Sequence, residues 1–432
     1  MTKFLGAGLL SLLVFGASAQ INTPYSRYGM GEILNARNTV SKGMGGIATT
    51  FFDSLTRSVN FINPASYSKT NQVTFDVGFE YESRNLKVPG TIDSYNSNNL
   101  GFNYLAIAMP LMRTKNTNKT YWGLTFGLKP YSKIGYKVTQ GANQPGIDSL
   151  NTLYNGDGGL FQAFVGSGIR YKNFAIGANF GAMFGQQNFS TIRSVVSVTD
   201  YYINSEHRVN TGLSGIFTDI GAQYDLKVGK KSTLHLAGNV KLANTLNGSR
   251  DSRKGTILYN TLGDHDTLDV AENITGVKGK VELPVSYSIG AMYEMSYKFL
   301  IGVEYERTEW AKYSNYGLKD NVANSQYFRF GGQVLPMGGK SFFNNMVYRL
   351  GFYTGKDYYV TTQGQVPVWA VSVGFGIPIR KYVQYLEQNS FINTSFEFGT
   401  RGNNTFPASE NFFKINLGLT LTDNWFKKRK FY

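Results

Sequence analysis

A stretch of ten residues decides the fold class of this chain: residues 73–82 read VTFDVGFEYE. Every second residue in it is Val, Phe or Tyr, and the residues between them are polar, acidic or glycine. Successive side chains of a β-strand point to opposite faces of the sheet. The stretch therefore predicts a strand with one apolar face and one polar face.

The same alternation recurs at 234–242, 299–306 and 413–422. Segments of about ten residues with this period, separated by turn residues, are typical of transmembrane β-barrels. A soluble β-sandwich also alternates, so the pattern alone does not separate the two. Long strands, signs of export and aromatic pairs near strand ends favour the barrel, because aromatic side chains gather at membrane interfaces. The expected interface pairs are Tyr121-Trp122, Tyr358-Tyr359 and Trp425-Phe426.

We expect an all-β fold: a transmembrane antiparallel β-barrel of about 14 strands, an even number as in bacterial single-chain barrels. The expected strands lie near 72–82, 99–109, 120–138, 159–171, 173–189, 208–226, 232–247, 281–296, 298–309, 325–335, 342–354, 368–378, 389–400 and 410–422. The barrel would occupy residues 71–432. Its longest loops, at 145–157 and 247–280, should lie outside the cell.

The first residues indicate the compartment. Residues 1–19 read MTKFLGAGLLSLLVFGASA, in which Lys3 precedes an apolar run that ends in Ala17-Ser18-Ala19. This order is that of a cleavable signal peptide. The apolar run is too short for a membrane anchor, which needs about 20 residues. We therefore expect export to the bacterial outer membrane, with residues 20–70, which show no clear period, as a separate N-terminal segment.

Composition excludes several classes of function. The 432 residues contain no Cys, and 43 Lys and Arg against 28 Asp and Glu give a formal charge of +15. Without Cys there is no disulfide scaffold, thiolate zinc site or cysteine nucleophile. No compact basic patch is interleaved with aromatics, so nucleic acid is not an expected partner. The charge, including the tail WFKKRK at 425–430, instead indicates anionic lipid headgroups and lipopolysaccharide phosphates.

No motif supports an enzyme, a metal site or a cofactor. The three His residues stand at 207, 235 and 265, and His265 has no second His at ligand spacing. The chain lacks a G-x-S-x-G elbow, and its glycine clusters lack the Lys-Ser/Thr ending of a phosphate-binding loop. We therefore expect a protein that is not an enzyme and binds no cofactor.

Several short motifs occur in a particular order along the chain: GMGG at 43–46, NPAS at 63–66, ELP at 282–284 before SIG at 288–290, FLIGVEYERTEW at 299–310 and WAVSVGFGIP at 369–378. In this order and spacing the chain resembles the FadL-like outer-membrane transporters of long-chain fatty acids and other hydrophobic compounds. It looks most like the branch common in Bacteroidetes.

The resemblance implies that residues 20–70 fold into the lumen as a plug, and that a kink in the third strand opens the wall sideways. It makes Asn63, Pro64, Ala65 and Pro130 the candidate plug and gate residues. Proline cannot donate to a β-ladder, so Pro130 predicts a break in pairing on its own account. The simpler readings are a turn at 63–65 and a bulge at Pro130 that sets the curvature of the barrel.

Polar positions of the alternating strands should face the lumen. The candidate lumen-lining residues are Asp76, Glu80, Glu82, Glu304, Glu306, Glu397 and Lys414. They would either line a polar channel or form a hydrated, ion-paired interior with a structural purpose. A charged lumen suits hydrophobic cargo poorly, and lateral exit above the plug would resolve that difficulty.

Two functions follow from these patterns. One is passive uptake of hydrophobic or amphipathic small molecules such as long-chain fatty acids, with lateral exit through the wall. The other is a scaffold or adaptor barrel in a larger outer-membrane secretion or assembly complex, with PYSRYG at 24–29 and the basic tail as docking features. Expected partners are membrane lipid, a cargo or partner proteins, and the barrel-insertion machinery, which would recognise the C-terminal strand. A general porin is less favoured, because the plug would fill its lumen.

Overall fold

The computed structural model describes most of the chain. The described ranges are 23–34, 36–52, 56–88, 94–112, 120–144, 147–196, 202–259, 265–295, 298–336, 342–379, 390–406 and 408–423. The expected signal peptide and the basic tail at 425–430 lie outside these ranges. Within them, no helix is both long and apolar enough to cross a membrane.

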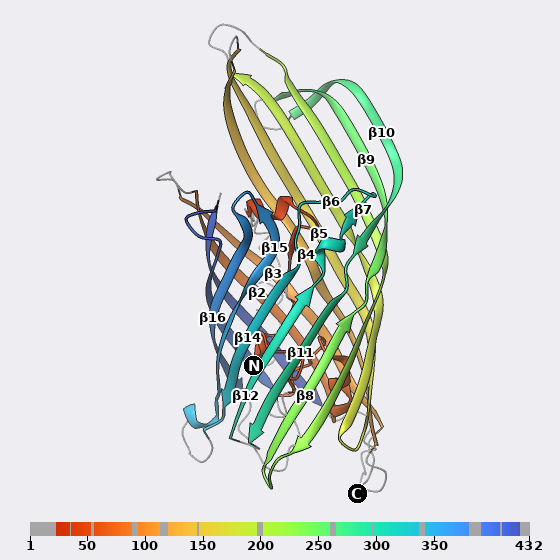
Figure 1. Cartoon of the computed structure of the whole chain (residues 1–432), viewed down its shortest axis with the longest axis vertical. Coiled ribbons are helices and arrows are strands. Elements are labelled where there is room, and N and C mark those ends of the chain that lie inside the picture. The colour runs from red at the N-terminus through yellow and green to blue at the C-terminus, as the bar shows by residue number, and fades with distance from the viewer. Residues whose placement is uncertain are drawn as a thin grey trace, which may run out of the picture.

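One closed antiparallel sheet dominates the structure (Figure 1). Its long strands are β2 (Val73–Lys87), β3 (Ser94–Met112), β4 (Thr120–Gln144), β5 (Ile147–Tyr171), β6 (Phe174–Val196), β7 (Asn204–Lys227), β8 (Ser232–Lys241), β9 (Asn244–Tyr259), β10 (His265–Leu283), β11 (Ser286–Met295), β12 (Phe299–Thr308), β14 (Ser325–Val334), β15 (Val347–Thr361), β16 (Gly364–Pro378), β17 (Phe391–Arg401) and β18 (Ser409–Asp423). The barrel closes where β18 pairs with β2 along their whole length.

The expected count of fourteen strands is confirmed. The sheet has 18 strands, of which β1 (Glu32–Ile33) and β13 (Ser314–Asn315) are two-residue pieces. β8 and β9 follow each other along the same neighbour, β7, and so act as one strand. β10 and β11 form a second such pair against β9 and β8. The all-β antiparallel barrel predicted from the alternation is therefore correct.

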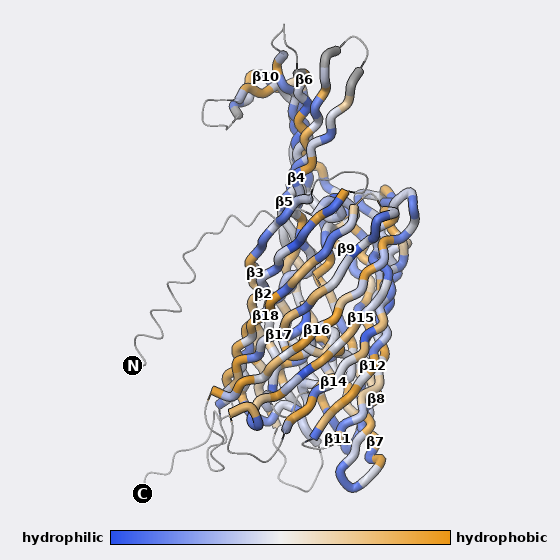
Figure 2. Tube along the Cα trace, turned by 90° about the vertical axis from the view of Figure 1, so that its left-hand side faces the viewer, coloured by the Kyte–Doolittle hydropathy of each residue, from blue (hydrophilic) through white to orange (hydrophobic). Residues whose placement is uncertain are grey.

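Alternating exposure explains why these sequences form a wall. On β6, Phe174, Ile176, Phe180 and Phe184 are between 44% and 54% exposed, whereas Ala175 between them is buried. Figure 2 shows the same alternation of hydrophobic and hydrophilic residues around the barrel. So many large exposed apolar side chains on every wall strand are typical of a surface that faces lipid.

Two expectations about loops and interfaces are wrong. The segments 145–157 and 247–280 are largely strand, because β5 begins at Ile147 and β9 and β10 run through most of the second segment. Together with β4, β6 and β7 they rise beyond the other strands as an extension (Figure 1). In its strand β10, the residues from 266 to 279 are nearly all exposed, so this strand lacks the one-sided burial that makes a wall strand alternate. Tyr358 and Tyr359 lie inside the barrel, each 1% exposed, rather than at an interface.

The described part of the N-terminal segment, residues 23–34, 36–52 and 56–72, lies within the barrel (Figure 1). It contains η1 (Pro24–Arg27), β1, α2 (Thr39–Lys42) and η2 (Pro64–Lys69). α2 packs against β16–β18, and η2 packs against β3–β7. The segment starts near the extension, where the Thr23 amide donates to the Gly135 carbonyl at 3.0 Å, and ends at the opposite rim, where β2 begins.

Glycines in the wall make room for this segment. Gly123, Gly168, Gly177 and Gly221 face one another in the register of β4–β7. The backbone of η2 and the side chain of Asn63 lie so close above this glycine row that a methyl group at any of the four would overlap them. On the other side of the barrel, Met44 and Gly45 lie equally close over Gly331 and Gly351. The motif at 43–46 is thus a backbone contact, with Gly45 at φ +67° and Gly46 at φ +81°.

Candidate binding site at an open seam in the barrel wall

Two neighbouring strands of the wall separate partway along their length. β3 and β4 pair only from Leu105 opposite Leu128 to Met112 opposite Trp122. Beyond Leu105, β3 keeps its pairing with β2, and β4 keeps its pairing with β5. We call this opening, between residues 94–104 of β3 and 129–144 of β4, the seam.

Local residue types explain why β4 leaves β3. Pairing on this side ends two residues before Pro130, which has no amide hydrogen to offer a ladder. On the other side of β4, a bulge between Pro130 and Ser132 interrupts the register with β5. Just beyond the bulge, Gly159 and Gly158 face Lys133 and Ile134, and their φ values of +150° and +123° would strain a side chain. The strands can therefore bend together at this level.

The N-terminal segment takes the place that β3 leaves. Glu32 and Ile33 of β1 pair in antiparallel register with Lys133 and Ser132 of β4. The next amide, that of Leu34, donates to the carbonyl of Tyr131 at 2.9 Å. β1 thus covers a short part of the free edge of β4, which is the usual way a strand edge is protected.

A cavity of about 610 Å³ lies at the seam. Its lining includes Arg329 and Lys414 on the inside of the barrel, and Phe161 and Phe184 on the outside, which are 40% and 44% exposed. Asn99 and Asn103 of β3 and Ser132 and Lys133 of β4 line it between those limits. The cavity therefore passes from the interior to the outer face through the seam.

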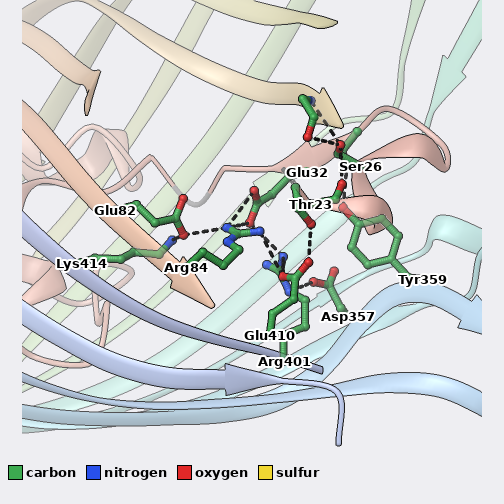
Figure 3. A network of polar contacts seen from close by, with 12 residues as sticks. Thr23, Ser26, Glu32, Glu82, Arg84, Asp357, Tyr359, Arg401, Glu410 and Lys414 are labelled. Carbon is green, nitrogen blue, oxygen red and sulfur yellow. Dashed lines mark hydrogen bonds and ion pairs between the residues drawn. The ribbon is translucent and has the colours of Figure 1, made fainter. Parts of the chain in front are cut away.

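Arg84 is at the centre of the ion pairs that hold β1 in place (Figure 3). Its guanidinium lies 2.9 Å from a carboxylate oxygen of Glu32, 2.6 Å from Glu82 and 3.0 Å from Glu410. Arg401 approaches the same Glu32 oxygen at 2.9 Å. Because each of these side chains is mostly buried, the pairing satisfies charges that would otherwise be costly to hide from water.

Glu32 is the only member of this cluster from the N-terminal segment that carries a charge. Burial alone would raise its pKa, but Arg84, Arg401 and Lys414 outweigh that effect and hold the pKa well below its usual range. Nearby, the Thr23 hydroxyl donates to Glu410 at 2.6 Å, and the Tyr25 hydroxyl donates to the Ala408 carbonyl at 2.5 Å. The start of the segment is therefore fixed to β2, β17 and β18.

A second buried cluster fixes the middle of the segment. Arg37 places its two terminal nitrogens 2.9 Å from Glu304 and 2.8 Å from Glu306. Arg329 also pairs with Glu306, at 2.8 Å. The second oxygen of Glu304 accepts the amides of Ala48 and Thr49 at 2.7 and 2.6 Å. One carboxylate of the wall thus binds both a side chain and the backbone of the segment.

The residues expected to line the lumen all lie at the interior, and most contact the N-terminal segment. Asp76 accepts hydrogen bonds from Ser58 and from the amide of Val59, at 2.5 and 2.8 Å. Glu80 pairs with Lys42, Lys414 lies 3.2 Å from Glu82, and Glu397 accepts from Tyr353 at 2.9 Å.

The candidate residues Asn63, Pro64 and Ala65 are far from the seam. Asn63 caps η2: its side-chain oxygen accepts a hydrogen bond from the Ala65 backbone amide at 3.0 Å. Its side-chain nitrogen donates to the Thr49 carbonyl at 2.7 Å. Pro64 lies over Gly168 and Gly177 of the glycine row. Pro130 is therefore the one of the four candidates that lines the cavity.

Sequence reasoning found the wall carboxylates Glu82, Glu304 and Glu306 and missed their arginine partners Arg84, Arg37 and Arg329. Arg84 and Glu410 continue the alternation of strands that were predicted, so their inward position was readable. Glu32 and Arg37 stand in a segment without period, and no local signal marks them. Elsewhere, within the described ranges, no three or more His, Asp or Glu residues gather as metal ligands would.

A closed 14-strand barrel with an ion-paired segment inside and one open seam has the fold of FadL-type outer-membrane channels. The Pseudomonas putida toluene transporter TodX aligns with a TM-score of 0.56 at 13% identity, over 90% of this chain and 99% of that one. The Ralstonia pickettii toluene transporter TbuX gives 0.54 at 13%, over 89% and 98%, and a Pseudomonas aeruginosa FadL homologue gives 0.54 at 12%, over 90% and 99%. At such identities the likeness is one of fold.

A family model described as BamG matches residues 1–432, so the chain belongs to the BamG family. No curated protein matches the chain.

Proposed function

We propose that this protein is a passive outer-membrane channel for amphipathic small molecules such as long-chain fatty acids, which leave sideways through the seam. The observation that supports it is the cavity that joins the interior to the outer face between β3 and β4. Its charged lining favours cargo with a polar end over a pure hydrocarbon. The similar structures TodX and TbuX are described as toluene transporters, which is consistent with passage toward lipid.

In this proposal, residues 20–70 are the plug and residues 71–432 the barrel. β1 is the part of the plug whose displacement would open the path, because it rests on the free edge of β4 through few backbone bonds, and the ion pairs of Glu32 would have to break for it to move. Pro130 keeps the seam open, while η2, which Asn63 caps, stays on the glycine row. Displacement of β1 would widen the path past Ser132 and Lys133.

The test is a disulfide that ties β1 to β4. Ile33 and Ser132 face each other in antiparallel register, a geometry that a disulfide can bridge. The chain has no cysteine, so the pair Ile33→Cys/Ser132→Cys would form the only disulfide in the variant. We expect uptake of labelled fatty acid into cells to fall when the pair is oxidised and to return on reduction.

The matched control is Thr400→Cys/Asn411→Cys, which joins two facing residues of β17 and β18 away from the seam. It should leave uptake unchanged in both redox states. Equal uptake by the oxidised β1–β4 variant and the control would refute lateral passage at this place.

A scaffold or adaptor role in an outer-membrane complex is the second candidate, and the extension favours it. Leu268, Val270, Ile274 and Val277 of β10 are between 42% and 51% exposed in a part of the protein beyond the barrel wall. Apolar side chains in such a place are typical of protein contacts. Purification from the native membrane in mild detergent decides: a stoichiometric partner supports the adaptor, and a monomer contradicts it.

Two finer expectations remain proposals. Cleavage of residues 1–19 would be tested by sequencing the N-terminus of the protein from outer membranes. A role of the C-terminal strand in barrel insertion would be tested by deleting residues 413–432, after which normal insertion would count against it. Membership of a Bacteroidetes branch is a further prediction from the sequence.

A further inference from the structure

An apolar groove of about 540 Å³ lies on the outer wall directly below the seam. Its floor is formed by Ala163 and Ala182, which face each other in the register of β5 and β6. Larger apolar side chains from β3–β7 form its sides: Leu105, Ile107, Phe126, Leu128, Val165 and Phe180. The apolar lining of the groove suits a hydrocarbon chain.

The groove leads up to the outer end of the cavity. Phe161 and Phe184, which line the cavity, stand two residues above Ala163 and Ala182 on the same face of β5 and β6. An apolar path on the lipid side thus meets a polar opening in the wall. A molecule that filled both would have one apolar end and one polar end.

The polar opening has a cation that no carboxylate holds. Arg37, Lys42, Arg329, Arg401 and Lys414 line the cavity, and each lies within 4 Å of an Asp or Glu oxygen.

Lys133 also lines the cavity, but within the described part of the chain its ammonium makes no ion pair or hydrogen bond. The carboxylates that act on it from a distance, Glu82, Glu32 and Glu80, are already bound by other cations.

Neutral polar groups line the same cavity as this cation. The hydroxyl of Ser132, a residue only 3% exposed, has no hydrogen-bond partner among the residues that are described. Asn99, Asn103, Gln186 and Asn188 also line the cavity. A lone ammonium, an unpaired buried hydroxyl and several amides can together bind a phosphate oxygen by charge and by hydrogen bonds.

The height of Lys133 above the lower membrane interface matches a lipid headgroup. Tyr121 and Trp122 are exposed near the lower end of β4, where interface aromatics belong. Lys133 follows Trp122 by eleven residues on the same strand. At about 3.3 Å per residue and a tilt of about 40°, that distance is about 28 Å along the membrane normal, against an apolar band of about 25 Å. Phe126 and Leu128 fall inside the band.

We propose that the seam binds one anionic membrane lipid from the leaflet on the side of the extension. Its phosphate pairs with Lys133 and hydrogen-bonds to Ser132, and one of its acyl chains lies in the groove over Ala163 and Ala182. This proposal rests on the lateral opening of the proposed function and identifies an anionic lipid as the molecule that occupies it. It does not require that any cargo passes.

The test uses the full-length protein in lipid nanodiscs that contain equal amounts of phosphatidylglycerol and phosphatidylcholine. Native mass spectrometry of the released protein counts the retained lipids. We expect one phosphatidylglycerol per barrel, and we expect Lys133→Gln to lower its preference over phosphatidylcholine by about tenfold, the loss of one charge-assisted contact. Lys137→Gln, four residues along the same strand face and exposed, is the matched control and should retain the preference.

A second variant tests the groove. Ala182→Phe fills its floor and should reduce retention of both lipids, whereas Ala291→Phe, an outward position on β11 away from the seam, should not. Folding of each variant is checked by the heat-dependent mobility of the barrel in detergent gels.

Three results would overturn the proposal: unchanged preference in Lys133→Gln, unchanged retention in Ala182→Phe, or displacement of the lipid by millimolar inorganic phosphate alone, which would indicate a site for a free anion. The lipid count is independent of uptake. A seam that retains lipid while the β1–β4 disulfide leaves uptake unchanged would refute only the channel, and a seam without lipid whose disulfide blocks uptake would refute only this site.

Discussion

Arg37 is the residue whose loss should most loosen the interior. It is 3% exposed and pairs with both Glu304 and Glu306. Removing one partner of a buried ion pair leaves unpaired charge and costs about 3 kcal/mol or more. We expect Arg37→Met to raise hydrogen–deuterium exchange of the amides around Ala48 and Thr49, which bind Glu304.

The control for this prediction is Arg253→Met. Arg253 pairs with Glu206 at 3.5 Å, and its side chain is 36% exposed, so its loss should cost less than about 1 kcal/mol. Equal exchange in the two variants would mean that the Arg37 cluster does not hold the N-terminal segment.

Glu32 gives the attachment of β1 a defined dependence on pH. Its pKa in the folded protein lies well below its usual range because Arg84, Arg401 and Lys414 outweigh the effect of burial. Its contribution to stability is therefore complete above the unfolded pKa, about 4.3, and is lost as the pH falls through the lower folded value. We expect protection of the Leu34 amide, corrected for intrinsic exchange, to stay constant from pH 8 to about 4.5 and to fall only below it.

Glu32→Gln removes the charge at every pH. In this variant the Leu34 amide should be less protected at pH 7 than in the natural protein, and its corrected protection should no longer change below pH 4.5. A decrease in protection of the natural protein between pH 8 and 5 would contradict the assignment to Glu32.

Among the elements, η2 depends on the glycine row beneath it. A Cβ at Gly221 of β7 would overlap the side chain of Asn63, whereas a Cβ at Gly212 of the same strand meets nothing within 4 Å. We expect Gly221→Val to weaken the packing of η2 on the glycine row by about 1–3 kcal/mol, as overpacking does. Gly212→Val should change this packing free energy by less than about 0.5 kcal/mol. Exchange of the Ser66 and Thr70 amides, which donate within this turn, measures the difference; similar exchange in both variants would refute the packing argument.

The wall strands were predictable, and the other elements were not, for a physical reason. A strand between lipid and a packed interior must alternate, as residues 73–82 do. The upper part of β10 is exposed on both faces, so its sequence resembles that of a loop. The contacts of Glu32 and Arg37 join residues hundreds of positions apart, such as Glu32 and Arg401, and no local pattern encodes such a pair.

At the scale of the whole molecule, the barrel and its extension are separable in structure. The lower half of the wall closes through β18 and β2 and through β8 and β11, and none of these pairings involves the extension. Among the described residues, the N-terminal segment contacts the extension near its start, through Thr23 and Ser26 against Gly135 and through Arg27, which lies 4.1 Å over the ring of Tyr154. The barrel and the extension can therefore serve different purposes: the barrel acts in the membrane, and the extension is free to contact a partner.

Shortening the extension tests that separation. Arg253 of β9 faces Asn273 of β10, so replacing residues 254–272 with Asn-Gly gives a two-residue hairpin in the same register. We expect the variant to insert, to keep its heat-dependent gel mobility and to retain uptake, because the barrel, the seam and the ion-pair clusters lie below the cut. Loss of a co-purifying partner with uptake intact would assign the extension to the adaptor role. Loss of uptake in a folded variant would mean instead that the extension belongs to the path of the cargo.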